Sequence, residues 1–162
     1  MTVEIRIDPL LDPRVAALLQ AHLDDMHRLS PAESVHALDL VALRAPEITF
    51  WSAWRGELLL GCAALKELGD GHGEVKSMRT APAFRGQGIA SALLRTLMDE
   101  ATRRGLRRLS LETGTHPEFA SARALYRNYG FLPCGPFGSY VADPFSTFMT
   151  RLLEPATAGA GL

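Results

Sequence analysis

Cysteine is scarce in this sequence. The 162 residues include two cysteines, Cys62 and Cys134, which stand far apart within apolar stretches. They do not form the cysteine framework of a small secreted scaffold, and we expect them to be buried as small hydrophobic side chains. Neither stands near a plausible histidine or at a predicted helix N-terminus, so a covalent cysteine mechanism is not expected.

Long apolar runs and an excess of one charge are also missing. No window approaches 18 uninterrupted apolar residues, and the first residues, MTVEIRIDP, are charged, which argues against a membrane span and a signal peptide. The net charge of −1 gives no general attraction to nucleic acid or to an anionic membrane. We therefore expect a cytoplasmic protein with no nucleic-acid or membrane partner and no bound metal.

The first half of the chain is predicted to contain two helices and four strands. Asp12-Pro13 places an N-cap acid before proline at the first helical position, and Ser30 to Glu33 has the capping-box pattern of a second helix. The predicted elements are a strand over 3–7, a helix from residue 12, a second helix from 30 to about 43, a hairpin of strands 48–54 and 58–65, a loop over 66–73 and a strand over 74–80.

The second half is predicted to alternate between helices and strands. An amphipathic helix covers 88–104, a strand covers 109–113, a Thr115/Glu118 capping box opens a helix that ends at Gly130, and strands cover 131–134 and 145–153. The hairpin before a strand-loop-helix-strand unit excludes an all-parallel sheet. We expect one α/β (α+β) domain over residues 1–153, with a mixed sheet of about seven strands and four helices, and a flexible tail over 154–162.

The loop before the third predicted helix has the features of an anion site. Its sequence, Arg85-Gly-Gln-Gly-Ile-Ala-Ser91, joins a strand to a helix. The glycines allow a sharp turn and a close approach of a ligand, and the free N–H groups at a helix start attract an anion. A diphosphate fits this description, although a glycine-rich cap without a ligand fits the loop alone as well.

Two common nucleotide motifs match this loop poorly. A P-loop needs Gly-Lys-Ser/Thr, but Gly88 is followed by Ile89 and Ala90. A Rossmann loop needs Gly or Ala where Ser91 stands, and its strand is usually apolar, whereas this strand carries Glu74, Lys76 and Arg79. Glu112, at the end of the next strand, is the only feature that favours a Rossmann site.

The loop resembles the Gln/Arg-x-x-Gly-x-Gly/Ala signature of the GNAT N-acetyltransferase superfamily. A second segment about 40 residues later, Ala122 to Phe131, resembles that family's Ala-x-x-Leu-Tyr-x-x-x-Gly-Phe pattern, and the element order agrees from Val3 to Leu153. The resemblance implies a mostly antiparallel sheet with a V-shaped splay, and acetyl-CoA as co-substrate without a metal. Family members are often dimers, so the resemblance leaves a homodimer open.

The resemblance also implies which residues bind the cofactor. The pantetheine arm would pair with the backbone of the strand before the loop, and the diphosphate would take the amides of the loop and of the first helical turn. The residues implied are Met78, Arg79, Thr80, Arg85, Gly86, Gln87, Gly88, Ile89, Ala90 and Ser91. Many members carry Asn seven residues before the family tyrosine, where this chain has Phe119, so one cofactor hydrogen bond is in doubt.

Two residues are implied as catalytic. Tyr126 matches the tyrosine that protonates the departing CoA thiolate, and Glu74 matches a strand position where some members place the general base. Glu112 and His72 are weaker candidates for the base. By spacing alone, Tyr126 also fits the core face of its helix, and Glu74 also fits an exposed strand end.

The acceptor is expected between the first two helices, the middle strands and the loop before the last strand. The candidate contacts are Ser34, His36, Trp51, His116 and Tyr140, although Trp51 and Trp54 should face opposite sides of the sheet. The implied activity is direct transfer of acetyl to a primary amine of a small molecule or, less favoured, of a protein or peptide. A non-catalytic acyl-CoA-binding regulatory module and a nucleotide-dependent reductase are the alternatives.

Overall fold

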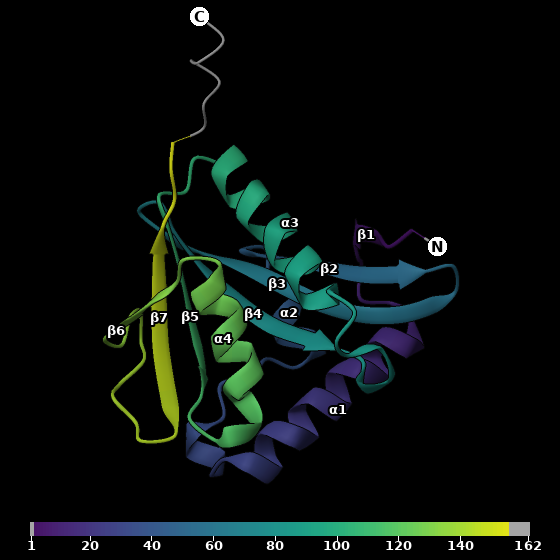
Figure 1. The fold of residues 1–162 in the computed structure, drawn as a ribbon, viewed down its shortest axis with the longest axis horizontal. Helices are drawn as coiled ribbons and strands as arrows, with labels where there is room; N and C mark the ends of the chain where they lie inside the picture. Colours follow the sequence, from purple (N-terminus) through teal and green to yellow (C-terminus); the bar gives the residue numbers. More distant parts are fainter. Residues whose placement is uncertain (1, 156–162) are drawn as a thin grey trace, which may run out of the picture.

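The computed structural model describes residues 2–155 and contains seven strands and four α-helices in that range (Figure 1). In chain order these are β1 (Glu4–Ile7), α1 (Pro13–Leu29), α2 (Leu40–Leu43), β2 (Ile48–Arg55), β3 (Leu58–Gly69), β4 (His72–Thr80), α3 (Ile89–Arg103), β5 (Arg108–Gly114), α4 (Ala120–Asn128), β6 (Leu132–Cys134) and β7 (Ser146–Leu152). Three short 3-10 turns accompany them: η1 (Ala32–Ser34), η2 (Pro82–Phe84) and η3 (Pro117–Phe119). The predicted element order is confirmed.

The strands form one sheet in the order β1-β2-β3-β4-β5-β7-β6. Every neighbouring pair is antiparallel except β4 and β5, which are parallel. The ladder between β4 and β5 joins only residues 72–75 to 108–111, although β4 continues to Thr80 and β5 to Gly114. The two strands therefore separate at their carboxyl ends, and this gap is where a ligand can enter the sheet.

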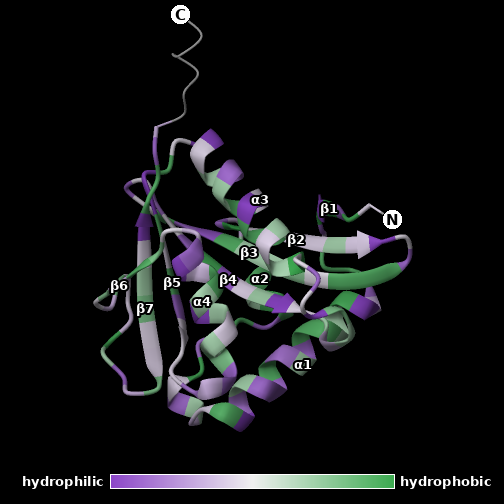
Figure 2. Cartoon of the chain, viewed as in Figure 1, coloured by the Kyte–Doolittle hydropathy of each residue, from purple (hydrophilic) through white to green (hydrophobic). Residues whose placement is uncertain are grey.

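The helices cover the two faces of the sheet. On one face, Leu93, Leu94 and Leu97 of α3 pack with Tyr126 of α4 against the sheet. On the other face, α1 and α2 pack against β2 and β3 through the cluster of Leu10, Val15, Leu18, Leu19, Leu43, Phe50, Trp54, Cys62 and Ala64. Figure 2 shows the matching pattern of alternating hydrophobic and polar residues along α3. Trp51 and Trp54 belong to opposite clusters, as their spacing predicts.

The predicted helix over 30–43 is wrong in its first ten residues. Ser30 instead ends α1, and its backbone N–H donates to the Met26 carbonyl. Only η1 follows, without a side-chain cap, and α2 begins after Asp39, whose carboxylate accepts from the Ala42 amide. A capping box needs a free helix start, and Ser30 is already committed to the helix before it.

The predicted loop over 66–73 is also wrong. β3 continues to Gly69 and β4 starts at His72, so the connection is the two-residue turn Asp70-Gly71. Both turn residues have positive φ, 55° and 74°, as expected for the Asp-Gly turn that suits a tight hairpin. β4 is therefore the second strand of a long, tightly connected hairpin.

Three smaller expectations have different outcomes. The Thr115/Glu118 capping box does not form, because Thr115 Oγ1 donates to the Pro144 carbonyl while His116 Nδ1 accepts from the Glu118 amide at the start of η3. No helix within residues 2–155 is long and apolar enough to cross a membrane. The predicted flexible tail over 154–162 lies, apart from its first two residues, outside the described range.

Candidate active site

A β-bulge shapes β4 where it leaves β5. Cys62 and Ala64 of β3 pair with Arg79 and Lys76, so β4 has one residue more than its partner over this stretch. Ser77, inside the bulge, has a positive φ of 54°. Bulges of this kind twist a strand and redirect its side chains. Two cavities adjoin the bulged segment.

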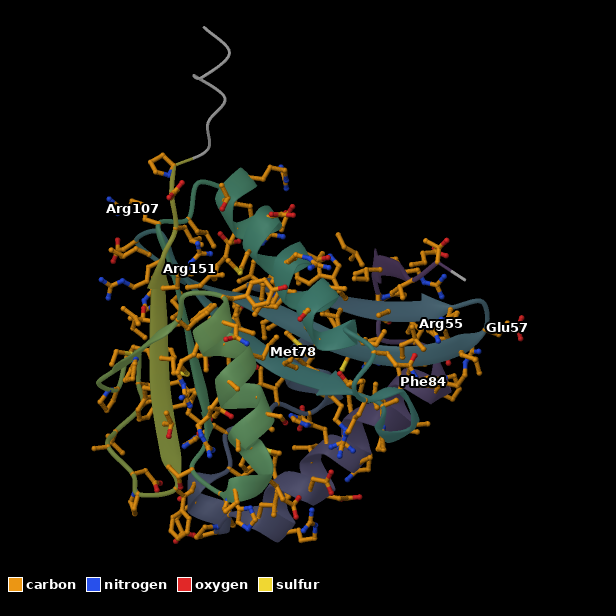
Figure 3. The ribbon with its side chains drawn as sticks, viewed as in Figure 1. Arg55, Glu57, Met78, Phe84, Arg107 and Arg151 are labelled. Atoms are coloured by element: carbon orange, nitrogen blue, oxygen red, sulfur yellow. The ribbon has the colours of Figure 1, made fainter. Side chains whose placement is uncertain are left out.

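The larger cavity lies beside the loop at the start of α3, and its volume is about 430 Å³. Nine of the ten residues predicted to bind the cofactor line it: Met78, Arg79, Thr80, Arg85, Gly86, Gly88, Ile89, Ala90 and Ser91. The tenth, Gln87, does not, and its side chain accepts a hydrogen bond from Arg55 at 3.2 Å instead. Figure 3 shows Arg55 at the tip of the β2–β3 hairpin.

The start of α3 leaves room for an anion. Gly88 is the N-cap, has a φ of +80° and has no side-chain capping bond. A Cβ built on Gly88 would meet no atom within 4 Å. The helix amides therefore border open space with the positive end of the helix dipole behind them. Arg85 adds a cation to the same cavity wall, so these residues fit the diphosphate of CoA.

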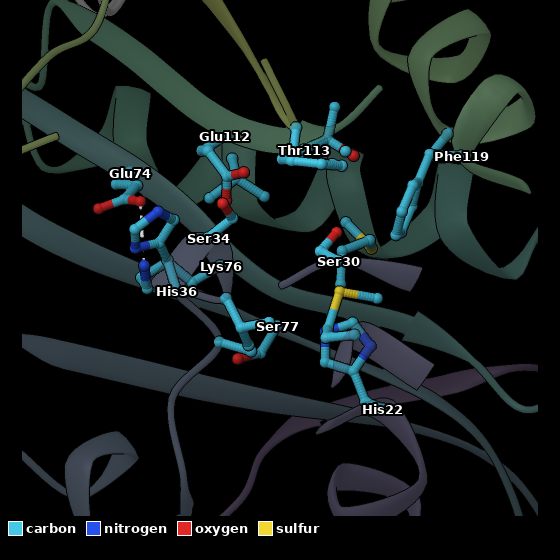
Figure 4. Close-up of a pocket in the computed structure, with 18 of the residues that line it drawn as sticks. His22, Ser30, Ser34, His36, Glu74, Lys76, Ser77, Glu112, Thr113 and Phe119 are labelled. Carbon is cyan, nitrogen blue, oxygen red and sulfur yellow. Dashed lines mark hydrogen bonds and ion pairs between the residues drawn. The ribbon is translucent and has the colours of Figure 1, made fainter. Parts of the chain in front are cut away.

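The smaller cavity has a volume of about 120 Å³ and lies between η1, β4 and β5 (Figure 4). Four of the predicted acceptor or base residues line it: Ser34, His36, Glu74 and Tyr140. Glu112, a weaker base candidate, lines it as well. Its walls thus combine polar and apolar side chains and carry two carboxylates.

One of these carboxylates, Glu74, is held in a buried polar group. Lys76 Nζ lies 3.1 Å from Glu74 Oε2 and donates to Tyr140 Oη at 2.9 Å, while the Tyr140 hydroxyl donates to Glu74 Oε2 at 2.5 Å. The side chains of Glu74 and Lys76 are only 4% and 9% exposed. Burial raises the pKa of Tyr140 first, and the Glu74 carboxylate raises it further. Tyr140 therefore keeps its proton and serves as a donor to Glu74.

The second carboxylate, Glu112, is placed differently. It stands on β5, past the end of the β4–β5 ladder. Burial is the main cause that raises its pKa above the usual 4.5, and the Ser146 hydroxyl, followed by the charges of His36 and Lys76, acts against this. A carboxylate with a raised pKa that faces a cavity is well suited to accept a proton near neutral pH.

Tyr126 stands where the two cavities meet, since it lines both. Its side chain is 6% exposed, and burial alone raises its pKa above the usual value. The phenol is therefore neutral at physiological pH and keeps a proton to donate. Phe119 also lines both cavities, and its ring packs against Gly114, where an added Cβ would overlap ring atoms.

Helix α1 supplies the wall that faces β4 at this junction. His22 and Met26 line both cavities, and Asp25 lines the larger one. Asp25 Oδ2 accepts a hydrogen bond from Arg79 Nη1 at 2.6 Å, which ties α1 to the bulged end of β4. This contact with Arg79 is the main cause that lowers the pKa of Asp25.

Three predicted residues lie away from both cavities. Trp51 is 5% exposed and belongs to the core under α3, while His116 is exposed and caps η3. His72 Nε2 forms a hydrogen bond of 2.7 Å with the Ser110 hydroxyl, and the His72 ring lies against the Phe137 ring. None of the three lines the larger or the smaller cavity.

Sequence reasoning did not select Lys76, His22 or Met26. Lys76 is two residues from Glu74, so both side chains face the same side of β4, and this spacing was a usable signal. His22 and Met26 are four residues apart on one face of α1, but an apolar helix face gives no indication of a ligand. Among the described residues, no cluster of three or more histidine, cysteine or acidic side chains could hold a metal.

Comparisons with known proteins identify the family to which the chain belongs. The family model "Acetyltransferase (GNAT) family" matches residues 15–131. An uncharacterized N-acetyltransferase, YsnE, of Bacillus subtilis is 51% identical over 151 residues, which cover 93% of this chain and 100% of the relative. An IAA acetyltransferase of Azospirillum brasilense is 43% identical over 151 residues, covering 91% of this chain and 95% of the relative.

Solved structures show the same fold. PaiA N-acetyltransferase of Thermoplasma acidophilum, solved in complex with coenzyme A, has a TM-score of 0.70 and 15% identity, with 94% of this chain and 99% of that chain covered. At this identity the likeness concerns the fold alone, whereas the family model and the relatives above cover most of the sequence. The chain therefore belongs to the GNAT family of acetyltransferases.

Proposed function

We propose that this protein transfers the acetyl group of acetyl-CoA directly to a primary amine of a small molecule, in a complex that holds both substrates. The observation that carries the proposal is the meeting of the two cavities at Tyr126. The larger cavity ends at the helix start that fits a diphosphate. The smaller one is small and carries two carboxylates, as expected for a site that takes the head of an amine.

Each step of the proposed reaction is assigned to a group of this chain. The amine nitrogen forms a bond with the thioester carbon, and the backbone N–H groups near Met78 and Arg79 stabilise the oxyanion. The C–S bond then breaks, Tyr126 gives its proton to the sulfur, and the proton that the nitrogen loses restores the phenol. The products are the acetylated amine and CoA as its thiol.

Two carboxylates, Glu74 and Glu112, are candidates for the general base. Glu74 remains a candidate that acts through water, but Lys76 and Tyr140 already occupy one of its oxygens. The raised pKa of Glu112 favours this residue for taking the proton from the incoming ammonium group and releasing it to solvent, so that the amine attacks in its neutral form. We therefore propose Glu112 as the base and Glu74 as the anchor of the Lys76–Tyr140 group.

The test is a panel of amines assayed for release of CoA thiol from acetyl-CoA, together with calorimetry of CoA binding. The panel contains monoamines, polyamines, amino acids and an N-terminal peptide, and IAA, for which one relative is named, is assayed separately beside it. We expect release with at least one small amine. Binding of CoA without release on any amine would contradict the proposal and favour a regulatory module, and failure to bind CoA would exclude both.

A further inference from the structure

Six residues line both cavities: His22, Met26, Met78, Phe119, Ala122 and Tyr126. Of these, only His22 and Tyr126 carry a side-chain nitrogen or oxygen. Tyr126 is the acid of the proposed reaction, but His22 has no part in it. A second polar group at the point where two substrates must meet requires an explanation.

His22 reaches this point from a different wall than the other polar groups. It lies on α1, whereas Glu112 lies on β5 and Tyr126 on α4. Figure 4 shows His22 and Glu112 on opposite sides of the smaller cavity. The imidazole, the carboxylate and the phenol therefore border one space from three separate elements of the fold.

The imidazole has unused hydrogen-bonding capacity. Its Nδ1 is buried and has no hydrogen-bond partner among the described residues. Burial, followed by the charge of Arg79, lowers the pKa of His22 to about 4, although Asp25 acts in the opposite direction. The ring is thus neutral at physiological pH, with one nitrogen as donor and the other as acceptor. Of the two ring nitrogens, only Nδ1 is buried without a partner in the described part of the chain, so Nε2 is the nitrogen that a ligand in the two cavities can reach.

We propose that His22 binds the acceptor amine, accepting a hydrogen bond from its N–H and so directing the nitrogen lone pair at the thioester. This inference rests on the proposed acetyl transfer. The charge of the ring matters for the role, because a protonated imidazole would donate from both nitrogens and repel an ammonium group. The apolar walls of Met26 and Phe119 strengthen the contact by keeping water out of the junction.

The test compares His22→Ala, His22→Asn and His22→Gln with the wild type, using the best acceptor from the amine panel. We expect His22→Ala to lower kcat/KM for the amine about tenfold or more, which corresponds to the loss of one good hydrogen bond. In His22→Ala the dissociation constant of acetyl-CoA should differ from that of the wild type by less than about twofold. One of the two amide variants should restore part of the activity, since each places a polar atom near one ring nitrogen.

The matched control is His27→Ala, because His27 is exposed on the same helix. It should leave the kinetics unchanged. Unchanged amine kinetics in His22→Ala, or an equal loss of acetyl-CoA affinity, would overturn the inference in favour of a structural role.

A spectroscopic measurement decides the point even without turnover. The ring resonances of His22 should shift when the acceptor amine is added to the complex with CoA, in which no transfer can occur, and those of His27 should not move. Unmoved His22 resonances when the amine binds to that complex would overturn this inference and leave the proposed function intact. A wild-type protein that binds CoA but acetylates no amine would overturn the proposed function and, with it, the amine contact.

Discussion

Replacing Tyr126 with phenylalanine is the most direct test of the transfer chemistry, because it removes a single oxygen. Tyr126 is 6% exposed, and burial is the sole cause of its raised pKa, with no hydrogen bond contributing. Loss of an unpaired hydroxyl should change the free energy of unfolding by less than about 1 kcal/mol. The ring and its contact with Phe131, at 5.9 Å between centroids, remain in place, so the cavity walls are kept.

The effect on turnover should be much larger than the effect on stability. A positioned general acid typically contributes about 10²–10⁴-fold, and a thiolate is a fairly good leaving group even without protonation. We therefore expect kcat to fall about 10²-fold, which is about 2.7 kcal/mol of transition-state stabilisation. Acetyl-CoA should bind with an affinity within about threefold of the wild type, because the hydroxyl matters mainly when the C–S bond breaks.

Thiol release under saturating acetyl-CoA measures kcat, and calorimetry measures the affinity for acetyl-CoA. Tyr129→Phe is the matched control, because Tyr129 follows the same helix, accepts a hydrogen bond from Arg95 and lines neither cavity. It should keep full activity. A parallel loss of kcat and acetyl-CoA affinity in Tyr126→Phe would mean that the tyrosine is structural, and a kcat near that of the wild type would remove it from the mechanism.

Three further predictions follow from the geometry. Gly88→Glu should abolish CoA binding in calorimetry. Gly88→Ala carries the same backbone strain of about 1 kcal/mol at φ +80° but should weaken CoA binding less. If the two variants bind CoA with equal affinity, the diphosphate assignment is refuted. Glu112→Gln should remove the acid limb of the pH profile of kcat/KM above pH 4.5, and an unchanged profile would return the base role to Glu74. Because the pKa of Glu112 is raised in the folded protein, its charged form destabilises the fold. The same variant should therefore raise Tm at neutral pH but not below pH 4. In Gly114→Ala the added methyl group should displace the Phe119 ring and lower the free energy of unfolding by about 1–3 kcal/mol. Adding Phe119→Leu to this variant should restore part of the lost Tm. A Tm that Gly114→Ala leaves unchanged would show that the ring has room to move.

Local patterns predicted most of the fold. The hairpin of β2 and β3, the Asp12-Pro13 start of α1 and the Gly88 start of α3 each depend on neighbours along the chain, and all three were predictable. The failures occurred where two local signals compete. Ser30 can start a helix or end one, and the choice was decided by the length of α1. The Asp70-Gly71 pair is typical of a tight hairpin turn, but the polar residues around it favoured the prediction of a longer loop.

The sequence by itself determined the family and the glycine turn before α3, and it led to the proposals of a diphosphate site at that turn and of Tyr126 as the acid, because these depend on residues at fixed spacing within single segments. Only the tertiary structure decided which polar groups share a cavity. Glu74 is paired with Lys76 and Tyr140, Glu112 lines the smaller cavity, and His22 joins the site from α1, although these residues come from distant parts of the chain. Their roles depend on burial and on the distances between charges, and the sequence contains neither until the splayed strands and the helix over them are in place.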